Sequence, residues 1–393
     1  MKKLAYQQQV SSRCSRRLFA AGLFFVGLMA CLAIGVSTAQ AQINTKMYNI
    51  KSMGILAGMK ACEPAAMNNL GQVTGTATAG EHQAAFLYYY SDKEEEMEAV
   101  GDLGSRAFAI NPAGIIVGDA YFPSQLRAVS HAALFNGGGV ADLGTLKDQM
   151  FSRATGMNAM RQVVGYSGNQ RDSAESRAFI WTSMTGMIDI GTLGGPFAQA
   201  LAINDPGFVT GTSQTNEWVR SGATHAFTYQ PLSITERNTK KMRDLGTLGG
   251  DSSYGMAINA SNHVVGYSTI STADGRVHAF FHGGHKMIDL GTLGRDALNE
   301  CSAALAVNNA DQVVGVNYTP TNDRDPFNQV AFIWSPRAEG GEMINLNHLI
   351  AQDGQKKYWI LTAAAINDSG QIAASAYDYE NKTTIAVLLT PAE

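Results

Sequence analysis

The sequence lacks the local motifs by which many enzyme classes are recognised. It contains no Gly-x-Ser-x-Gly elbow, no His-Glu-x-x-His helix, no phosphate-binding glycine loop and no Cys-x-x-Cys pair. The segment Gly165-Tyr166-Ser167-Gly168 approaches the first of these but has the wrong spacing. These absences do not exclude enzymes whose sites are assembled from scattered loop residues. The sequence therefore has to be interpreted from its repeats rather than from a single motif.

Cysteine, charge and long apolar runs are also scarce. Charged residues make up 16% of the chain, and only 4 of its 393 residues are cysteine. Cys14 and Cys31 fall in a leader, which leaves Cys62 and Cys301 for the folded domain. These two lie in repeat units that would not be neighbours in a ring, which favours two separate thiols; one disulfide between them is the alternative under another topology. No segment after Val36 is long and apolar enough to span a membrane.

The first 41 residues have the layout of a bacterial export signal. Basic residues precede the apolar run Leu18–Val36, and Ala39-Gln40-Ala41 supplies small residues for cleavage. We expect ordinary Sec export and removal of residues 1–41; alternatives are twin-arginine export, because of Ser15-Arg16-Arg17, and lipidation of Cys31. Removal shifts the formal net charge from −4 to −9, and a chain this acidic is not expected to bind nucleic acid. The mature protein is expected to be secreted, extracellular or periplasmic.

What the chain has in abundance is one short phrase that returns seven times: a small apolar pair, an asparagine, and glycines or their substitutes at fixed distances. Consecutive asparagines are 43, 47, 46, 55, 49 and 59 residues apart, and the extra length falls in polar segments. A period of roughly 40 to 50 residues indicates a repeat architecture in which these asparagines are structural. They are Asn68, Asn111, Asn158, Asn204, Asn259, Asn308 and Asn367.

Two further phrases accompany each asparagine. Asp-Leu-Gly-Thr-Leu-Gly-Gly precedes it, complete at Asp244–Gly250, and His-Ala-Phe-x-aromatic follows it, as in His225–Tyr229. With Ala-Ile-Asn and Val-Val-Gly, these phrases give about four short strands per unit and no convincing helix. The third residue after the asparagine is Gly, Asn or Asp in six of seven copies, which predicts a hairpin turn with a positive φ. Arg161 is the exception, strained or differently turned.

These features predict an all-β fold: a β-propeller of seven four-stranded blades that occupies residues 42–393 as a single domain. A strand beginning at Tyr48 and a final strand over Thr383–Leu389 are expected to pair in one blade and close the ring. Such closure would leave no open sheet edge. An open β-solenoid or a pair of packed sheets is the alternative.

The linked phrases Asp-Leu-Gly-Thr-Leu-Gly-Gly, Ala-Ile-Asn-x-x-Gly-x-Val-Val-Gly and His-Ala-Phe-x-Trp resemble the extracellular repeat family called HAF after its His-Ala-Phe triplet. The resemblance covers Tyr48 to Pro391. It implies an exported bacterial repeat protein with a propeller-like fold and no established common activity. Some relatives carry a C-terminal sorting segment, whereas this sequence ends at Leu388–Glu393, so secretion or periplasmic residence is expected rather than anchoring.

The richest cluster of potential metal ligands is His278, His282 and His285. His278 and His282 would share one face of a strand, and a glycine turn could return His285 toward them, a set suited to zinc or copper. The competing interpretation is that His278 is the repeat histidine and His282 the repeat aromatic. No cofactor is predicted, and a divalent metal here is the alternative.

The repeat histidines and aspartates also allow two interpretations. Equivalent residues of different blades form circles around the ring axis. His131, Arg177, His225 and His278 could therefore form one such circle around the channel. The favoured interpretation is that each pins its blade by bonding to a neighbouring backbone group. Likewise the aspartates of the Asp-Leu-Gly phrases could form a carboxylate ring, but an Asp before a tight glycine turn more often caps backbone N–H groups.

Loops that depart from the repeat are the better candidates for binding. Tyr88, Tyr89 and Tyr90 stand beside an acidic run, and Trp218 stands among polar residues. Exposed aromatic rings beside polar groups suit sugars and polymer surfaces; solvated loops with a buried ring are the alternative. The sequence therefore predicts a binding scaffold for a polysaccharide, a surface polymer or a protein. An extracellular hydrolase or lyase with its site at the channel mouth is the second hypothesis.

Overall fold

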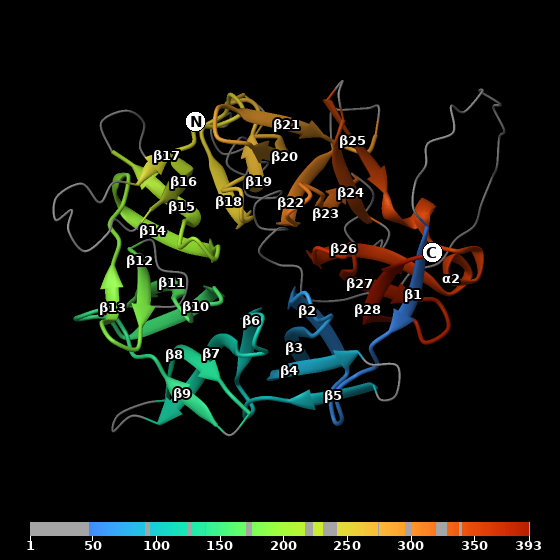
Figure 1. The fold of residues 1–393 in the computed structure, drawn as a ribbon, viewed down its shortest axis with the longest axis horizontal. Helices are drawn as coiled ribbons and strands as arrows, with labels where there is room; N and C mark the ends of the chain where they lie inside the picture. The colour runs from blue at the N-terminus through green and yellow to red at the C-terminus, as the bar shows by residue number, and fades with distance from the viewer. Residues whose placement is uncertain are drawn as a thin grey trace, which may run out of the picture.

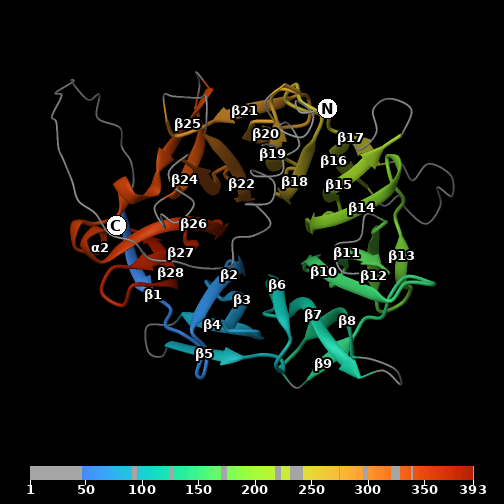
Figure 2. The same ribbon diagram turned by 180° about the vertical axis from the view of Figure 1, so that it is seen from behind.

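The computed structural model describes residues 47–90, 95–123, 128–137, 139–169, 175–216, 223–230, 242–273, 275–294, 300–319, 328–337 and 340–392. They form seven four-stranded antiparallel sheets arranged in a ring, a seven-bladed β-propeller (Figure 1). The ring is equally clear from behind (Figure 2). The predicted fold class is thus confirmed, whereas the predicted signal peptide, residues 1–41, lies outside the described residues.

Each blade consists of consecutive strands, with the first strand nearest the centre. Blade 1 is β2 (Ala61–Met67), β3 (Val73–Ala79), β4 (His82–Tyr90) and β5 (Glu95–Ala99). Blade 2 is β6 (Arg106–Ile110), β7 (Ile116–Pro123), β8 (Ala128–Phe135) and β9 (Val140–Asp142). Blade 3 is β10 (Phe151–Met157), β11 (Val163–Gly168), β12 (Arg177–Thr182) and β13 (Gly186–Asp189). Blade 4 is β14 (Gly194–Ile203), β15 (Val209–Thr215), β16 (Thr224–Tyr229) and β17 (Arg243–Asp244).

The remaining blades continue the pattern. Blade 5 is β18 (Ser253–Ile258), β19 (Val264–Thr269), β20 (Val277–His282) and β21 (Met287–Gly291). Blade 6 is β22 (Cys301–Val307), β23 (Val313–Tyr318), β24 (Gln329–Arg337) and β25 (Gly340–Asn345). A 3-10 turn, η2 (Leu346–Leu349), and the short helix α2 (Gln352–Lys357) lead to blade 7, which is β26 (Tyr358–Ile366), β27 (Ile372–Asp378), β28 (Thr383–Pro391) and β1 (Tyr48–Ser52).

The N-terminal strand closes the ring as predicted. β1 pairs antiparallel with β28, with Ile50 opposite Leu389, and forms the outermost strand of blade 7. Figure 1 shows β1 in blue beside the red C-terminal strands. Tyr48, the first residue of β1, is buried in the core of blade 7. The first and last described strands are therefore held in one sheet, and the outer edge of β28 is covered.

The phenylalanine of the His-Ala-Phe phrase explains why the blades stack. Phe227 of blade 4 is fully buried and packs in one cluster with Val164 of blade 3, and Phe332 of blade 6 packs with Val265 of blade 5. Full burial of a side chain of this size contributes about 1.5–3 kcal/mol. Repetition of the phrase therefore supplies a core between successive blades.

The predicted hairpin after each repeat asparagine is also present. The third residue after the asparagine has a positive φ in all seven units: Gly71, Gly114, Arg161, Gly207, Asn262, Asp311 and Gly370. Arg161, at φ 59°, is in the left-handed conformation despite its side chain, which confirms the strained copy. All seven hairpins join an innermost strand to the second strand, so they lie at one end of the channel. We call this end the turn face.

Candidate functional site

The repeat asparagines form a belt at the turn face. Within its own turn, each side-chain oxygen accepts backbone N–H bonds, as Asn68 Oδ1 does from Leu70 and Gln72 at 3.0 and 3.1 Å. The side-chain Nδ2 donates to the backbone carbonyl of the next blade's asparagine, for example from Asn204 to Asn259 at 2.8 Å. The link from Asn367 to Asn68 carries the belt across the closure of the ring. The asparagines are therefore structural, and they fix the spacing of the channel mouth. The other links run from Asn68 to Asn111, Asn158 to Asn204, Asn259 to Asn308 and Asn308 to Asn367.

The belt is interrupted between blades 2 and 3. Asn111 is buried, and its Nδ2 has no hydrogen-bond partner. The same two blades are joined instead by Asp119 of β7, whose carboxylate is fully buried and bonds both Arg106 of its own blade and, at 3.2 Å, Arg153 of blade 3. An ion pair buried to this degree couples the two blades strongly. The sequence analysis missed it, although Asp119 breaks the repeat at a position where other copies carry Tyr, Thr, Val or Ser.

Around the channel mouth, the residue that follows each asparagine forms a second circle. Asp205 accepts a hydrogen bond from the Ala159 backbone at 2.8 Å, and Asp368 accepts one from the Asn309 backbone at 2.9 Å. Asp368 also receives amide bonds from the Asn69 and Asn309 side chains. Both carboxylates are exposed and line the same depression, of about 210 Å³. They come from blades 4 and 7, on different sides of the axis, and the sequence analysis did not identify them.

Below the mouth, the side chains that line the channel are mostly apolar. Each innermost strand has a β-bulge at the same position, and the extra residue faces a central cavity of about 260 Å³. The bulged residues are Ala65, Phe108, Thr155, Leu201, Met256, Leu305 and Ala364. Thr155 is the one hydroxyl among them, and its Oγ1 donates to the Ala200 carbonyl at 2.8 Å. This part of the channel can accommodate an apolar group, but its lining residues offer no acid or base.

The repeat histidines pair with the repeat aspartates of the same blade. His225 Nδ1 lies 2.8 Å from Asp244, and the pairs His131–Asp142 and His278–Asp289 have the same geometry, with Arg177–Asp189 as the blade 3 equivalent. These residues lie on the third and fourth strands, away from the channel. Two predictions for the repeat histidines are therefore wrong: the circle around the channel and the bond to a neighbouring backbone group. Strand pairing places each histidine opposite the carboxylate of its own blade.

The aspartates cap the glycine turns as expected. Gly246 N donates to Asp244 Oδ1 at 2.7 Å, and Gly291 N donates likewise to Asp289. Burial alone would raise the pKa of Asp244, but the bonds from His225 and Gly246 outweigh it, so the pKa falls below the ordinary Asp value; the pKa of Asp289 is lowered in the same way. These carboxylates are consequently held in their ionised form by the turn and the histidine.

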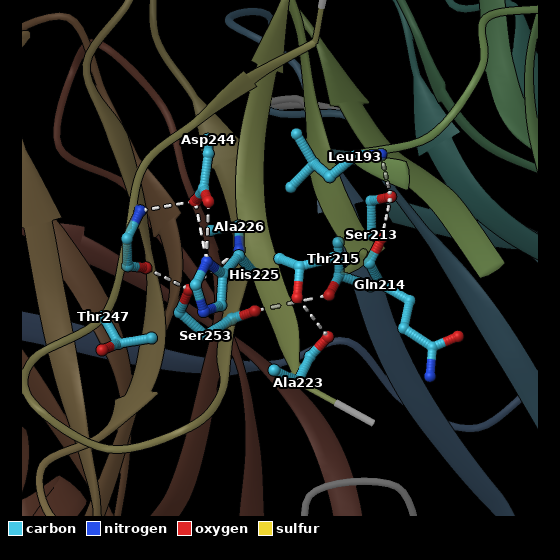
Figure 3. A network of polar contacts seen from close by, with 12 residues as sticks. Leu193, Ser213, Gln214, Thr215, Ala223, His225, Ala226, Asp244, Thr247 and Ser253 are labelled. Atoms are coloured by element: carbon cyan, nitrogen blue, oxygen red, sulfur yellow. Dashed lines mark hydrogen bonds and ion pairs between the residues drawn. The ribbon is translucent and has the colours of Figure 1, made fainter. Parts of the chain in front are cut away.

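A serine beside each His–Asp pair completes a link to the next blade, as Figure 3 shows for His225 and Asp244. Ser253 Oγ accepts from the Ala226 backbone at 2.8 Å and donates to the Gly246 carbonyl. Although Ser253, His225 and Asp244 have the composition of a hydrolase triad, the hydroxyl is fully buried and used by backbone groups. Ser152 and Ser302 repeat the arrangement. Alignment of the copies would have found these serines, because each is the first or second residue of an innermost strand.

The three histidines of the metal hypothesis are not brought together. His278 and His282 do lie on one strand, but four strand residues span about 13 Å, too far for one ion. His278 pairs with Asp289, while His282 Nδ1 accepts from Gly284 N at 3.2 Å. Burial lowers the pKa of His282. Within the described ranges, no three His, Cys, Asp or Glu side chains are arranged to hold a metal ion.

The aromatic binding hypothesis is altered as well. Tyr88 is only 1% exposed and packs in the core between blades 1 and 7, because it occupies the repeat's buried aromatic position; as a surface platform it was predicted wrongly. Tyr89 is 38% exposed on the outer part of blade 1, where its hydroxyl donates to Glu98 at 3.0 Å. Trp218 and the side chain of Tyr90 lie outside the described part of the chain.

The cysteines do not form a bridge with each other. Cys62 is a free, fully buried thiol in blade 1, and burial raises its pKa to about 11. Cys301 of blade 6 is not a free thiol, so the expectation of two unpaired cysteines is confirmed for Cys62 only. No helix in the part of the chain that the structure describes has the length and apolar character needed to cross a bilayer.

Comparison with known proteins gives similarity without an assigned activity. A family model described as "Protein of unknown function (DUF3466)" matches residues 196–388. No curated protein matches the chain. The crystal structure of TolB from Acinetobacter baumannii is 10% identical, with a TM-score of 0.42 over 82% of this chain and 64% of that chain. The structure of a puromycin-hydrolyzing peptidase from Mycobacterium tuberculosis is 12% identical, with a TM-score of 0.45 over 84% and 51%. The chain thus spans less than two thirds of either protein.

Proposed function

We propose that this chain is an exported propeller of the HAF-repeat kind that acts as an interaction scaffold and binds a protein partner through its turn face. The observation that carries the proposal is the contrast between the two kinds of polar residue. The repeated His, Asp and Ser side chains recur from blade to blade in the same contacts, whereas the position after the repeat asparagine carries a carboxylate only at Asp205 and Asp368, whose exposed side chains line the channel mouth. The asymmetric, accessible chemistry therefore lies at the turn face.

A protein partner fits this face better than a polysaccharide does. Tyr88 is buried and so cannot contribute to an aromatic platform. Apolar side chains stand out on the turn face instead: Leu70 and Met160 are the second residues after their repeat asparagines, and they are 69% and 64% exposed. Exposed aliphatic side chains around a polar depression are more typical of a protein interface than of a sugar site.

The second hypothesis, a hydrolase or lyase at the channel mouth, finds less support in the geometry. A carboxyl becomes a general acid when apolar surroundings favour its protonated form. Asp205 and Asp368 are exposed, and each accepts amide hydrogen bonds, so neither lies in apolar surroundings. These two residues suit charge recognition rather than proton transfer.

Retention and turnover can be measured in one experiment. The mature protein, Gln42 to Glu393, would be incubated with insoluble polysaccharides, ester polymers and immobilised bacterial envelope proteins, and both retention and released soluble product would be recorded. We expect retention on protein, no product, and loss of retention in the variant L70E/M160E but not in M184E, a control that is 94% exposed between β12 and β13. Product release, or equal retention of the two variants, would contradict the proposal.

A further inference from the structure

The channel has two chemically different parts in series. Its mouth, at the turn face, is lined mainly by polar groups, and the side chains of its interior are apolar apart from Thr155 and come from the seven innermost strands. Residues directly before the repeat asparagines, such as Met67, Ile258 and Ile366, line both parts, so the polar mouth opens onto the apolar interior. A ligand that fills both must itself be amphipathic.

The charge of the mouth is negative. Asp205 and Asp368 are the two carboxylates among the described residues that line it, and none of those residues is Lys, Arg or His. The acceptor bonds described above come from neutral amides, which bring no positive charge to the mouth. Because the two residues come from blades 4 and 7, a cation on the channel axis would lie between them. The mouth therefore complements a positive group.

The interior has room for an aliphatic side chain. Its volume is about 260 Å³, whereas an apolar cavity of about 150 Å³ already accepts benzene. Leu201, Met256 and Leu305 contribute flexible apolar surface, and methionine adapts to ligands of varied shape. The lining residues carry no charged group with which a polar ligand end could pair.

We infer that the turn face takes an extended peptide segment of a partner protein, with a lysine or terminal ammonium group between Asp205 and Asp368 and a large aliphatic side chain in the channel. This inference rests on the proposed function and names the chemistry of its partner. Charge complementarity selects a basic segment, and the negative charge of the chain favours its approach. The exposed Leu70 and Met160 would extend the apolar contact beyond the channel.

Calorimetry with defined peptides tests the inference on the full mature chain. The probes are Leu-Lys-Gly-Ser-Gly-Ser, its counterparts Leu-Glu-Gly-Ser-Gly-Ser and Ser-Lys-Gly-Ser-Gly-Ser, and an N-acetylated form of each. The key variant is D205N/D368N, which keeps the side-chain oxygens that cap Ala159 and Asn309. The matched control is E81Q, an exposed carboxylate in the β3–β4 turn at the opposite end of the blade.

The Leu-Lys peptide should bind most tightly, and D205N/D368N should weaken it about tenfold, as expected for two partly screened charge contacts, while E81Q should not. Ala109→Leu, which narrows the channel interior, should weaken the leucine peptides more than the serine peptide. Equal affinity for Lys and Glu peptides, undiminished binding by D205N/D368N, or no binding of any peptide would overturn the inference. If L70E/M160E still abolishes retention on envelope proteins, the proposed function survives that failure; if it does not, both fall.

Discussion

Glycine in the Val-Val-Gly phrase is a consequence of the bulge on the neighbouring strand. A Cβ added to Gly266 would lie 1.8 Å from the Tyr254 carbonyl oxygen, and one added to Gly118 would lie 1.8 Å from that of Arg106. The bulge brings the innermost strand's backbone against the second strand, where only glycine fits. Blade 7 has Ala374 at this position, and its innermost strand carries a second register shift, between Ile360 and Thr362.

Gly266→Ala should therefore destabilise the protein by about 1–3 kcal/mol or more, because backbone rather than a flexible side chain blocks the new methyl group. Denaturant unfolding would measure the loss. Gly139→Ala is the control, since nothing lies within 4 Å of a Cβ there. Equal stability of the two variants would show that the bulge does not require glycine.

The His225–Asp244 pair predicts how the stability of the fold changes at acid pH. The folded-state pKa of Asp244 is lowered, so the carboxylate stabilises the fold above its unfolded pKa, near 3.9, and this contribution is lost as the pH falls through the lower folded value. The stability difference between the wild type and Asp244→Asn should shrink as the pH falls below about 4. Urea unfolding at several pH values would measure it, with Glu81→Gln as control. A difference that grows as the pH falls below about 4 would contradict the assignment.

At the scale of elements, the seven blade interfaces are not equivalent. Six have a described asparagine link, while the contact between β6–β9 and β10–β13 has Asp119 and its two arginines in place of that link. Arg106 and Arg153 also stack over Phe108 at 5.3 and 5.1 Å, and Phe108 is one of the bulged channel residues. This interface therefore couples blade packing to the shape of the channel.

Asp119→Ala should cost about 3–5 kcal/mol, because it leaves two guanidinium groups with an uncompensated, partly buried charge. Hydrogen exchange should show the loss concentrated in β6, β7, β10 and β11. Asp102→Ala, which replaces an exposed aspartate between β5 and β6, should lower the free energy of unfolding far less. Similar losses in the two variants would mean that the ion pair contributes nothing beyond a surface charge.

Elements were predictable from the sequence to the extent that their causes are local. Alternating apolar residues and turn residues act within a unit, so the strands, the turn at Arg161 and the aspartate caps follow from single copies. The partner of His225 does not follow from a single copy, because the strand register has to be known before Asp244 can be placed opposite the histidine. Tyr88 was misplaced because burial between blades depends on the neighbouring blade.

For the whole molecule, closure determines both stability and site. Asp205 and Asp368 are far apart in sequence and meet at one mouth only because the ring closes between blades 7 and 1. No single repeat copy contains that information. The one indication of these two carboxylates in the sequence was the position directly after the repeat asparagine, compared across all copies.

Removal of residues 42–52 should strongly destabilise the ring. The deletion removes β1, leaves the edge of β28 unpaired and takes the buried Tyr48 from the core, which alone contributes about 1.5–3 kcal/mol. Size-exclusion chromatography should show association through the open edge, and thermal unfolding should show a lower Tm. Removing residues 42–46 only is the control. A monomeric truncated protein with unchanged Tm would indicate that the ring closes without β1.

The most direct test of the central claim is site-specific photo-crosslinking of the mature protein to its binding partner. A benzophenone side chain would replace Ala260, exposed at the channel mouth, or Met184, exposed on the outer rim. If the turn face is the binding surface, Ala260 should give a crosslinked species that a Leu-Lys peptide in excess suppresses, and Met184 should give none. Crosslinks from Met184 alone would contradict the account and place the interaction on the blade edges.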